Sequence, residues 1–324
     1  MSLRRFLYMV ADDWVDRSYS LRRIDTSRFF FFRHGSTEGE QPAPTPLDSS
    51  GGAGAIDPSA MEVSGGRLPE SALSVVAPHL KQFRGAIDFM LFKKLGNDGE
   101  NYKVVSMDHA GSTLMCDPGV TPAITPLPSL ATPKFAPFSL TVGSTLYVMD
   151  AVPERPNGHK RRSFEALFHG HLNSLQYKAW HWQSDLEPPP YVYGPRDSSH
   201  IIESYAVVAG SDILMSNKGG HTYLLRHGGR DMENANLCSP PVVYGHWKEY
   251  TQPPADWRLV RSCAVHLGGS KFCIVRFFET GKVLETVVTG VEVESSDEED
   301  EEVRVLRHKW ERYQLNIEYD YWVL

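Results

Sequence analysis

The first residues whose types and spacing could do chemistry are three histidines near the middle of the chain. His169 and His171 are two positions apart, and His181 follows ten positions later. On a β-strand, side chains at i and i+2 point to one face, so two imidazoles there could share a metal ion. However, Gly170 between them favours a turn, and no carboxylate or thiol lies at ligand spacing. We therefore expect no metal ion and no cofactor, with these histidines exposed or hydrogen-bonded.

Two serines form the clearest candidate modification site. Ser295 and Ser296 precede six acidic residues, 297–302, and each serine has a glutamate at the third position after it. That placement of charge is what acidophilic kinases recognise, and each phosphate would add about −1.5 to −2 charges to the segment. We therefore keep phosphorylation of these serines open. The alternative is that residues 294–302 form a disordered, solubilising loop between two strands.

Two tryptophans form a candidate stacking surface. In the run Trp180-His181-Trp182 both indole rings would point to the same face of a strand, where they could stack on a base or a sugar. The alternative is that Trp182 packs in the core, as its repeat partner Trp247 should. We favour core packing.

The charge of the chain has one main source. The net charge is −7, and removal of the six acidic residues at 297–302 leaves −1 for all other residues. A nearly neutral body lacks the basic stripe of a nucleic-acid-binding protein, and no apolar run approaches the ~18 residues of a membrane span. The short basic run 159–163 is predicted to be a solvated turn; a weak nuclear-import patch or a kinase site is the alternative.

The cysteines indicate a reducing compartment. Cys116, Cys238, Cys263 and Cys273 show neither metal-ligand spacing nor a disulfide framework, and the sequence has no Asn-x-Ser/Thr acceptor. The apolar run near the N-terminus ends at Asp12 and is too short for the core of a signal peptide. We expect reduced, mostly buried thiols and a location in the cytoplasm, the nucleus or both.

The elements that must position these residues are predicted to be strands. Apolar or alternating runs rich in β-branched and aromatic residues are separated by Gly, Pro, Asn and Asp. The predicted strands include 86–92, 102–107, 145–149, 204–208, 213–216 and 271–278. Residues 35–72 are rich in Pro, Gly and Ser and are predicted to be a flexible insertion, because they can bury little apolar area. We therefore expect one all-β domain over residues 1–324.

An internal repeat refines that prediction. A tryptophan, five residues and Pro-Pro occur twice, and a later Ser-x-Ala-Val strand leads into a glycine-serine turn. The repeat positions are Trp182, Pro188, Pro189 and Gly210 in the first copy, and Trp247, Pro253, Pro254 and Gly268 in the second. One unit cannot bury its own apolar face, but neighbouring units can, and the spacing suits four-stranded blades. The repeat predicts a β-propeller-like fold; a β-sandwich is the alternative.

The chain resembles a family of plant proteins, expanded in grasses, known only as a domain of unknown function with kelch-like or F-box-associated propeller character. The stretches that carry the resemblance, beside the Trp-Pro-Pro units, are 4–7, 19–25, 87–92, 144–150, 163–167, 266–268, 271–280 and 306–309. The resemblance implies a propeller fold and a plant intracellular setting. It brings no catalytic motif, so no active-site residue is carried over.

The chain departs from that family at residues 224–239. Relatives have a longer segment, rich in Trp and Gly, before the next Pro-Pro, whereas here only a polar stretch follows Tyr223. We therefore expect a shortened or incomplete blade, with an unpaired edge that is an aggregation hazard. A degenerate family member or a misassembled gene model is a further hypothesis.

The first functional hypothesis is a protein-interaction module. A propeller would present its loops to a protein partner that the sequence does not identify, with substrate recognition in a ubiquitin-ligase-like assembly as the more specific form. We expect a monomer that binds neither nucleic acid nor membrane. The sequence has no nucleophile elbow, P-loop, HExxH or EF-hand motif, so we expect no enzyme. The alternative is a propeller enzyme with a site at the central channel, which needs no linear motif.

Overall fold

The computed structural model is almost entirely β. It describes residues 3–13, 15–16, 18–31, 45–46, 66–76, 87–96, 99–119, 121–134, 137–150, 164–171, 178–184, 186, 202–207, 212–217, 222–226, 242–246, 254–281, 283–295, 303–317 and 319–324. These residues form strands β1 to β21 and one short 3-10 helix, η1. None of the described helical residues belongs to a helix long and apolar enough to cross a bilayer.

The described strands form five antiparallel sheets. Sheet A has the order β21 (Asp320–Val323), β1 (Phe6–Asp13), β2 (Ser18–Asp25) and β4 (Ser71–Val76). Sheet C contains β5 (Ile87–Gly96), β6 (Gly99–Asp108), β7 (Thr113–Asp117) and β8 (Ala123–Leu127). Sheet D contains β9 (Phe138–Val142), β10 (Thr145–Met149), β11 (Phe164–His171) and β12 (Lys178–Gln183).

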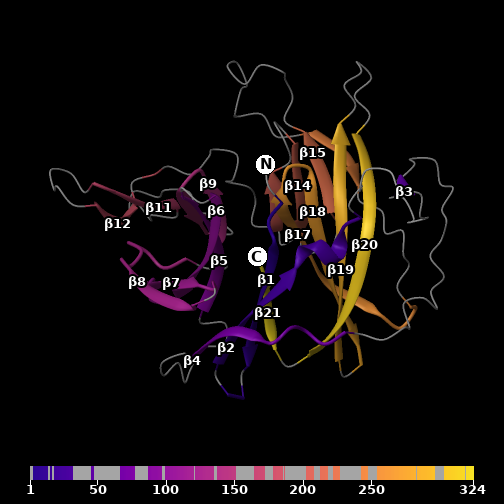
Figure 1. The fold of residues 1–324 in the computed structure, drawn as a ribbon, viewed down its shortest axis with the longest axis horizontal. Helices are drawn as coiled ribbons and strands as arrows, with labels where there is room; N and C mark the ends of the chain where they lie inside the picture. Colours follow the sequence, from indigo (N-terminus) through magenta and orange to yellow (C-terminus); the bar gives the residue numbers. More distant parts are fainter. Residues whose placement is uncertain are drawn as a thin grey trace, which may run out of the picture.

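Sheets E and B follow along the chain. Sheet E contains β13 (Ile202–Val207), β14 (Asp212–Asn217), β15 (Thr222–Arg226) and β16 (Val242–His246). Sheet B contains β17 (Arg258–Gly268), β18 (Lys271–Thr280), β19 (Val283–Ser295), β20 (Val303–Asn316) and the two-residue β3 (Thr45–Pro46). In Figure 1, sheets C and D lie on the left, sheet A near the centre, and sheets E and B on the right.

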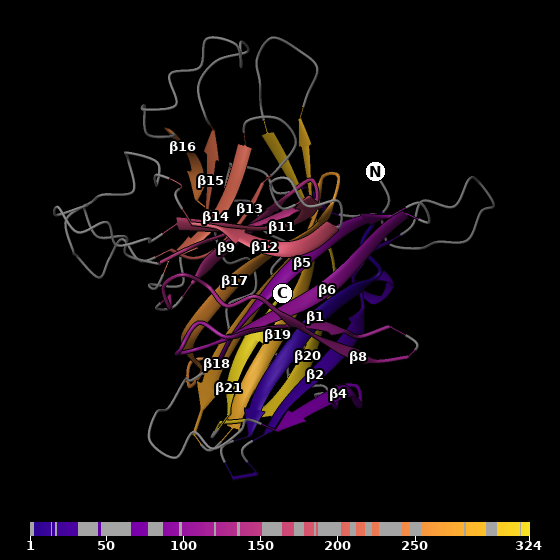
Figure 2. The same cartoon turned by 90° about the vertical axis from the view of Figure 1, so that its left-hand side faces the viewer.

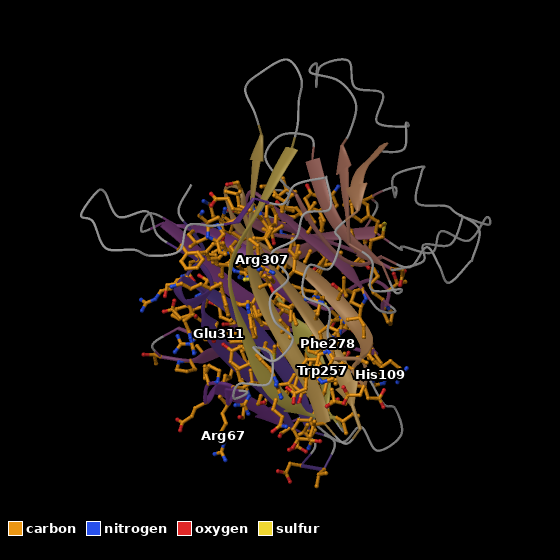
Figure 3. The ribbon with its side chains drawn as sticks, turned by 90° about the vertical axis from the view of Figure 1, so that its right-hand side faces the viewer. Arg67, His109, Trp257, Phe278, Arg307 and Glu311 are labelled. Atoms are coloured by element: carbon orange, nitrogen blue, oxygen red, sulfur yellow. The ribbon has the colours of Figure 1, made fainter. Side chains whose placement is uncertain are left out.

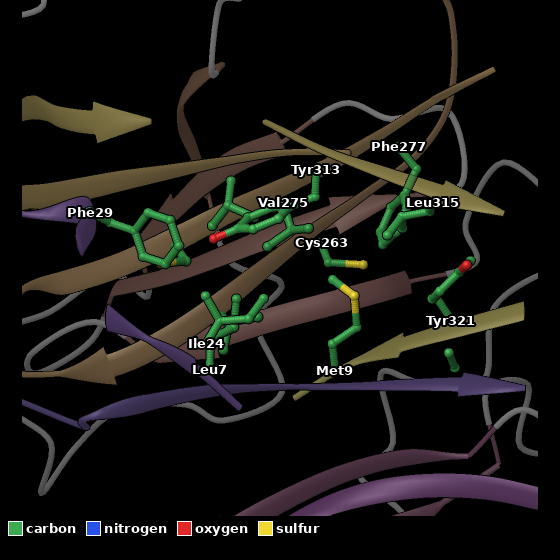
Figure 4. Packing of buried hydrophobic residues seen from close by; sticks show 14 of the residues in the cluster. Leu7, Met9, Ile24, Phe29, Cys263, Val275, Phe277, Tyr313, Leu315 and Tyr321 are labelled. Carbon is green, nitrogen blue, oxygen red and sulfur yellow. The ribbon is translucent and has the colours of Figure 1, made fainter. Parts of the chain in front are cut away.

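Neighbouring sheets pack face to face, as blades do. The largest core cluster joins sheets A and B and includes Leu7, Met9, Cys263, Val275 and Tyr313 (Figure 4). A second cluster joins the other face of sheet A to sheet C, and a third joins the other face of sheet C to sheet D. Figure 2 shows sheet C in front of sheets A and B when the molecule is viewed from that side. Strands β1, β2 and β21 of sheet A therefore place apolar side chains at two interfaces, one on each face of the sheet.

The first and last strands of the chain meet in sheet A. The C-terminal β21 pairs antiparallel with β1, with Val10 opposite Trp322. Beyond that ladder, Tyr8 and Leu324 exchange two backbone hydrogen bonds of 3.1 and 2.9 Å. Sheet A thus combines three N-terminal strands with one C-terminal strand. Together with the other sheets, each of four or more antiparallel strands, this arrangement confirms the predicted all-β, β-propeller-like fold class.

The repeat marks equivalent parts of successive sheets. Residues 204–207 belong to the first strand of sheet E, and 262–268 belong to the first strand of sheet B and lead into the turn before its second. Gly268, the last residue of β17, has a φ of +116°, and Gly269 in the same turn has a φ of +58°. L-residues with side chains rarely adopt such values, so glycine sets this hairpin.

The prediction of an incomplete blade is wrong. Sheet E has four paired strands, because β15 pairs with β14 and then with β16. A strand of five residues is enough for a blade edge, and Val242–His246 supplies it after the polar stretch. Sheet E therefore has the same number of strands as sheets A, C and D, and the residues between β15 and β16 lie outside the described residues. The degenerate-member hypothesis loses the observation that motivated it.

The range predicted to be a flexible insertion contributes strand residues at two places. Thr45–Pro46 pairs with β20, and Ser71 begins β4. Gly66 also bridges to Tyr313. The remaining residues between 35 and 65, and the acidic run 297–302, lie outside the described residues.

A short helical turn fills one end of the main core. Asp25 precedes η1 (Thr26–Phe29), and its Oδ1 accepts a hydrogen bond of 3.0 Å from the backbone N of Ser27. This cap directs Phe29 into the cluster between sheets A and B, where its side chain is fully buried. The carbonyl group of Phe29 lies directly against Gly290 of β19.

A buried ion pair fixes the connection between sheets C and D. Lys134 and Glu165 have fully buried side chains, and Lys134 Nζ lies 2.5 Å from Glu165 Oε1. The same carboxylate accepts backbone hydrogen bonds from Ala131 (2.9 Å) and Thr132 (3.2 Å). Glu165 on β11 therefore holds the segment that leads from β8 to β9.

A smaller cluster covers the outer face of sheet B. Trp257 packs against Phe278 with ring centroids 5.4 Å apart (Figure 3). The guanidinium of Arg312 lies 5.0 Å from the centre of the Trp257 ring. Arg312 also bonds Glu285 through Nε at 2.8 Å. Arg312 thus contacts both an aromatic cluster and the buried carboxylate of Glu285. The ion pair with Arg312 compensates the buried charge of that carboxylate.

Thr286 offers a test of the core between sheets A and B. Its Oγ1 is buried with no hydrogen-bond partner among the described residues. We expect Thr286→Val to raise the free energy of unfolding by about 1 kcal/mol, because it removes an unsatisfied hydroxyl at constant shape. The control is Thr113→Val, which removes a 2.6 Å hydrogen bond to the Pro128 carbonyl and should destabilise. Urea titrations measure both; a loss of stability in Thr286→Val would contradict the expectation.

Candidate functional site

A cavity of about 260 Å³ lies between sheets A and C, beside the start of β1. The cavity is lined by three short segments of the chain and by one side chain of β2. The lining residues are Leu3, Arg4, Arg5, Phe6, Tyr8, Arg23, Asn101, Tyr102, Asp117, Pro118 and Gly119. Its chemistry is that of arginines and aromatic rings, with a single carboxylate in the wall. We call it the arginine cavity.

Arg4 forms the buried wall of the arginine cavity. Only 3% of its surface is exposed, because it precedes β1 where the chain passes between sheets A and B. Its backbone N donates to the Leu267 carbonyl at 2.5 Å, and its Nη2 donates to the Leu324 carbonyl at 2.7 Å. The guanidinium carbon lies 5.5 Å from the centre of the Tyr102 ring. Burial lowers the pKa of Arg4 to about 10, so the side chain remains a cation at neutral pH.

Two more arginines flank one phenyl ring. The guanidinium carbons of Arg5 and Arg23 lie 5.0 and 5.1 Å from the centre of the Phe6 ring. Arg5 also lies 3.7 Å from Asp25, in an exposed ion pair. These residues come from β1, its preceding segment and β2, whose antiparallel register sets Phe6 opposite Asp25. Cation–π contacts with the Phe6 ring therefore keep two positive charges, those of Arg5 and Arg23, close together at the rim of the cavity.

The opposite wall contains one carboxylate, Asp117, which is already paired with a cation. Asp117, at the end of β7, forms an ion pair with Lys103 and accepts a 3.0 Å hydrogen bond from the Gly119 backbone. Tyr8 also lines the cavity, and burial raises the pKa of its hydroxyl although Arg4 and Arg23 lower it. The cations of the arginine cavity thus outnumber the carboxylates near it, which suits a site for an anion.

The histidines predicted as metal candidates are not brought together. His169 lies against the Trp180 ring at 5.0 Å, whereas His181 lies against the Phe168 ring at 3.8 Å. Phe168 and His169 are adjacent in β11, so these two histidines occupy opposite faces of sheet D. The side chain of His171 lies outside the described residues. Within the described residues, no group of three or more His, Cys, Asp or Glu has metal-binding geometry.

Trp180 and Trp182 lie on one face, as predicted, and pack half-buried against the core between sheets C and D. Both join the cluster between sheets C and D, where Trp180 meets the Phe92 ring edge-on at 5.5 Å. Trp182 donates from Nε1 to the Pro128 carbonyl at 2.8 Å. Core packing is therefore confirmed.

The remaining candidates lie at strand ends or outside the described residues. Ser295 is the last residue of β19 and pairs with Val303 of β20. The Pro254 carbonyl accepts a 2.9 Å hydrogen bond from Trp257 in the turn before β17. Phosphorylation of the two serines stays a prediction. The candidates outside the described residues are Ser296, Pro188, Pro189, Gly210, Trp247, Pro253 and the basic run 159–163.

Three of the four cysteines are buried free thiols. Burial raises the pKa of Cys116 to about 11 and that of Cys273 to about 12, so both stay protonated at neutral pH. Cys263 is buried in the core between sheets A and B. The prediction that the cysteines are mostly buried is confirmed for these three, and Cys238 lies outside the described residues.

Asp88 of β5 is a titratable group poised near neutral pH. Burial raises its pKa to about 6, although a hydrogen bond from Trp322 of β21 lowers it. A raised pKa favours folding below the unfolded value near 3.8, and this contribution is lost as the pH rises through 6.

We therefore expect Asp88→Asn to stabilise the protein by about 1–3 kcal/mol above pH 7 and to have little effect at pH 4. Asparagine keeps an acceptor for Trp322 and removes the buried charge. Urea titrations at pH 4 and pH 8 measure the difference, with Asp256→Asn at an exposed position as the control. An equal effect at both values would contradict the expectation.

The arginine cavity was missed from the sequence. Arg4, Arg5 and Arg23 lie in stretches that carry the family resemblance, but Tyr102 and Asp117 are far from them in the chain. The available signal was the pair of basic dipeptides, 4–5 and 22–23, on strands that could pair. Locating the wall formed by β6 and β7 requires the packing of sheet C on sheet A.

Comparison with known proteins identifies a family. No curated protein matches the chain. Among solved structures, the WD40 domain of SCAP from fission yeast matches with 10% identity and a TM-score of 0.24, covering 79% of this chain and 56% of that chain. Because this TM-score is low, we infer neither fold nor function from the match. The family model "Protein of unknown function (DUF1668)" matches residues 4–230 and 225–313. The chain therefore belongs to the DUF1668 family.

Proposed function

We propose that this chain is a protein-interaction module whose arginine cavity binds an acidic part of its partner. The observation that carries the proposal is the excess of cations: Arg4, Arg5 and Arg23 line the cavity together with one carboxylate, Asp117, which Lys103 already occupies. Sheets A and C provide a packed scaffold on both sides. Complementary charge steers association and excludes partners of the wrong sign.

The more specific aspects of this proposal rest on the sequence resemblance. We propose a kelch-like, F-box-associated type of propeller in a plant cell, located in the cytoplasm, the nucleus or both. Substrate recognition in a ubiquitin-ligase-like assembly is the role that this type suggests. We further propose a monomeric, non-enzymatic module that binds neither nucleic acid nor membrane.

Charge reversal at the cavity rim tests the proposed function. Wild-type protein, Arg23→Glu and the exposed control Arg67→Glu are immobilised and exposed to the same plant lysate. We expect a set of proteins that wild type and Arg67→Glu retain and that Arg23→Glu loses. If the same proteins bind all three, the arginine cavity does not select the partner, and the proposal is overturned.

A further inference from the structure

Arg4, which lines the arginine cavity, has a buried donor atom with no acceptor among the described residues. Arg4 is almost fully buried, and its Nε has no hydrogen-bond partner among the described residues. Its Nη2 is engaged by the Leu324 carbonyl, and its guanidinium otherwise meets the rings of Tyr8 and Tyr102. A buried charged donor left without an acceptor is costly, so such a group marks a place where a ligand can compensate.

The surrounding charges define the ligand. Arg4, Arg5, Arg23 and Lys103 bring four positive charges, whereas Asp25 and Asp117 bring two negative charges. Two positive charges are left in excess among these six groups. Each carboxylate already has a cationic neighbour, so Arg4 and Arg23 remain for the ligand. A phosphate monoester carries about −1.5 to −2 charges and three acceptor oxygens, which matches this excess more closely than a carboxylate does.

The size and walls of the cavity limit what carries the phosphate. Ligand pockets for drug-sized molecules begin at about 300 Å³, so a cavity of about 260 Å³ admits one group rather than an extended molecule. Phe6, Tyr8 and Tyr102 give it apolar walls, and Asn101 adds an amide. One phosphorylated side chain satisfies these conditions: its stem lies on the rings and its phosphate reaches the guanidinium groups.

We propose that the arginine cavity binds a phosphorylated side chain of a partner protein, with Arg4 and Arg23 as the phosphate ligands. This inference rests on the proposed function and names the acidic group that the partner presents. Arginine is suited to the role because its planar fork bonds two phosphate oxygens at once. Arg5, already close to Asp25, contributes charge at the rim.

Calorimetric titration with defined probes tests the inference. The probes are one peptide sequence carrying phosphotyrosine, phosphoserine, glutamate or unmodified tyrosine, and free inorganic phosphate. We expect a phosphopeptide to bind at least 10-fold more tightly than the glutamate and unmodified peptides, and more weakly as ionic strength rises. Arg23→Ala should weaken phosphopeptide binding about 10- to 100-fold, as expected for loss of a charge-assisted hydrogen bond.

Two further variants keep the test decisive. Arg67→Ala removes an exposed positive charge outside the cavity and should leave binding unchanged. Arg4→Lys keeps the buried charge but loses the guanidinium fork, and should weaken binding while its thermal unfolding remains cooperative. Free phosphate that binds as tightly as the peptides would overturn the protein partner and indicate a small-molecule site.

Other outcomes separate this inference from the proposed function. Equal affinity for glutamate and phosphorylated peptides would overturn the preference for phosphate and leave an acidic partner in place. Phosphopeptide binding that Arg23→Ala does not change would overturn the site. If no peptide binds although the lysate experiment shows partners that depend on Arg23, the proposed function stands and the phosphate inference fails.

Discussion

Replacement of Gly290 by alanine is expected to destabilise the protein by more than about 3 kcal/mol, and folded protein should be recovered poorly. A Cβ at this position would overlap the carbonyl oxygen of Phe29 and lie 3.0 Å from its carbonyl carbon and 3.1 Å from its Cβ. These are backbone atoms and a buried side-chain atom of η1, so they cannot rotate away. Relief requires that η1 or β19 move, which would disrupt the core between sheets A and B.

The matched control for this substitution is Gly143→Ala. Gly143 lies in the turn between β9 and β10 with a φ of +60°, and a Cβ there would have no atom within 4 Å. Its cost is the strain of a left-handed conformation alone, about 1–2 kcal/mol. Urea-induced unfolding of both variants measures the difference. A Gly290→Ala protein as stable as Gly143→Ala would show that η1 does not press against β19 as described.

Breaking the ion pair between Lys134 and Glu165 is expected to cost about 3–5 kcal/mol in either single variant. Lys134→Met leaves the buried Glu165 carboxylate without its cation, and Glu165→Gln leaves the buried ammonium without its anion. The carboxylate also accepts hydrogen bonds from the backbone of Ala131 and Thr132, so the segment between β8 and β9 should loosen in both.

The double variant Lys134→Met/Glu165→Gln distinguishes an ion pair from two independent contacts. It leaves no unpaired charge, so we expect it to be more stable than the sum of the single effects predicts by about 2 kcal/mol or more. Chemical denaturation of the four proteins completes a double-mutant cycle. Additive effects would contradict the pairing. Amide exchange over 128–134 should quicken in both single variants and less in the double variant.

Much of the sheet architecture could be predicted from the chain because its signals are local. Residues 145–149 alternate in burial along β10 as a period-2 pattern requires. The glycine-serine turns mark first hairpins because positive φ values at Gly143 and Gly268 leave few other solutions. The repeat predicted the successive sheets for the same reason, because each copy contains the residues of a turn and of a strand.

The prediction of an incomplete blade was wrong because the sequence signal for its fourth strand is weak. Sheet E was expected to be short of strand residues because a polar stretch follows Tyr223. However, the fourth strand, Val242–His246, lies beyond that stretch and is only five residues long. Such a strand is defined by pairing with β15 and by little in its own sequence. Pairing with β15 therefore makes residues 242–246 a strand although their local sequence gives little indication of one.

The arginine cavity could not be predicted for a related reason. Arg4 and Tyr102 are almost a hundred positions apart, and nothing in either segment indicates that the other is its neighbour. The two are brought together because one face of sheet A buries Tyr8 and Val10 against sheet C. The signals at 169–181 were local and conspicuous, yet the fold distributes these histidines over two faces of one sheet.

The pairing of β1 with β21 has a consequence for biosynthesis. Met9 to Asp12 leave the ribosome about 300 residues before their partners at 320–323. At roughly 5–20 residues per second, one edge of β1 stays unpaired for on the order of 15–60 s while the other sheets are made. That open edge is a template for pairing with other nascent chains. Sheet A is therefore completed only once β21 has been made, and the yield in cells should depend on how well chaperones protect the N-terminal strands until then.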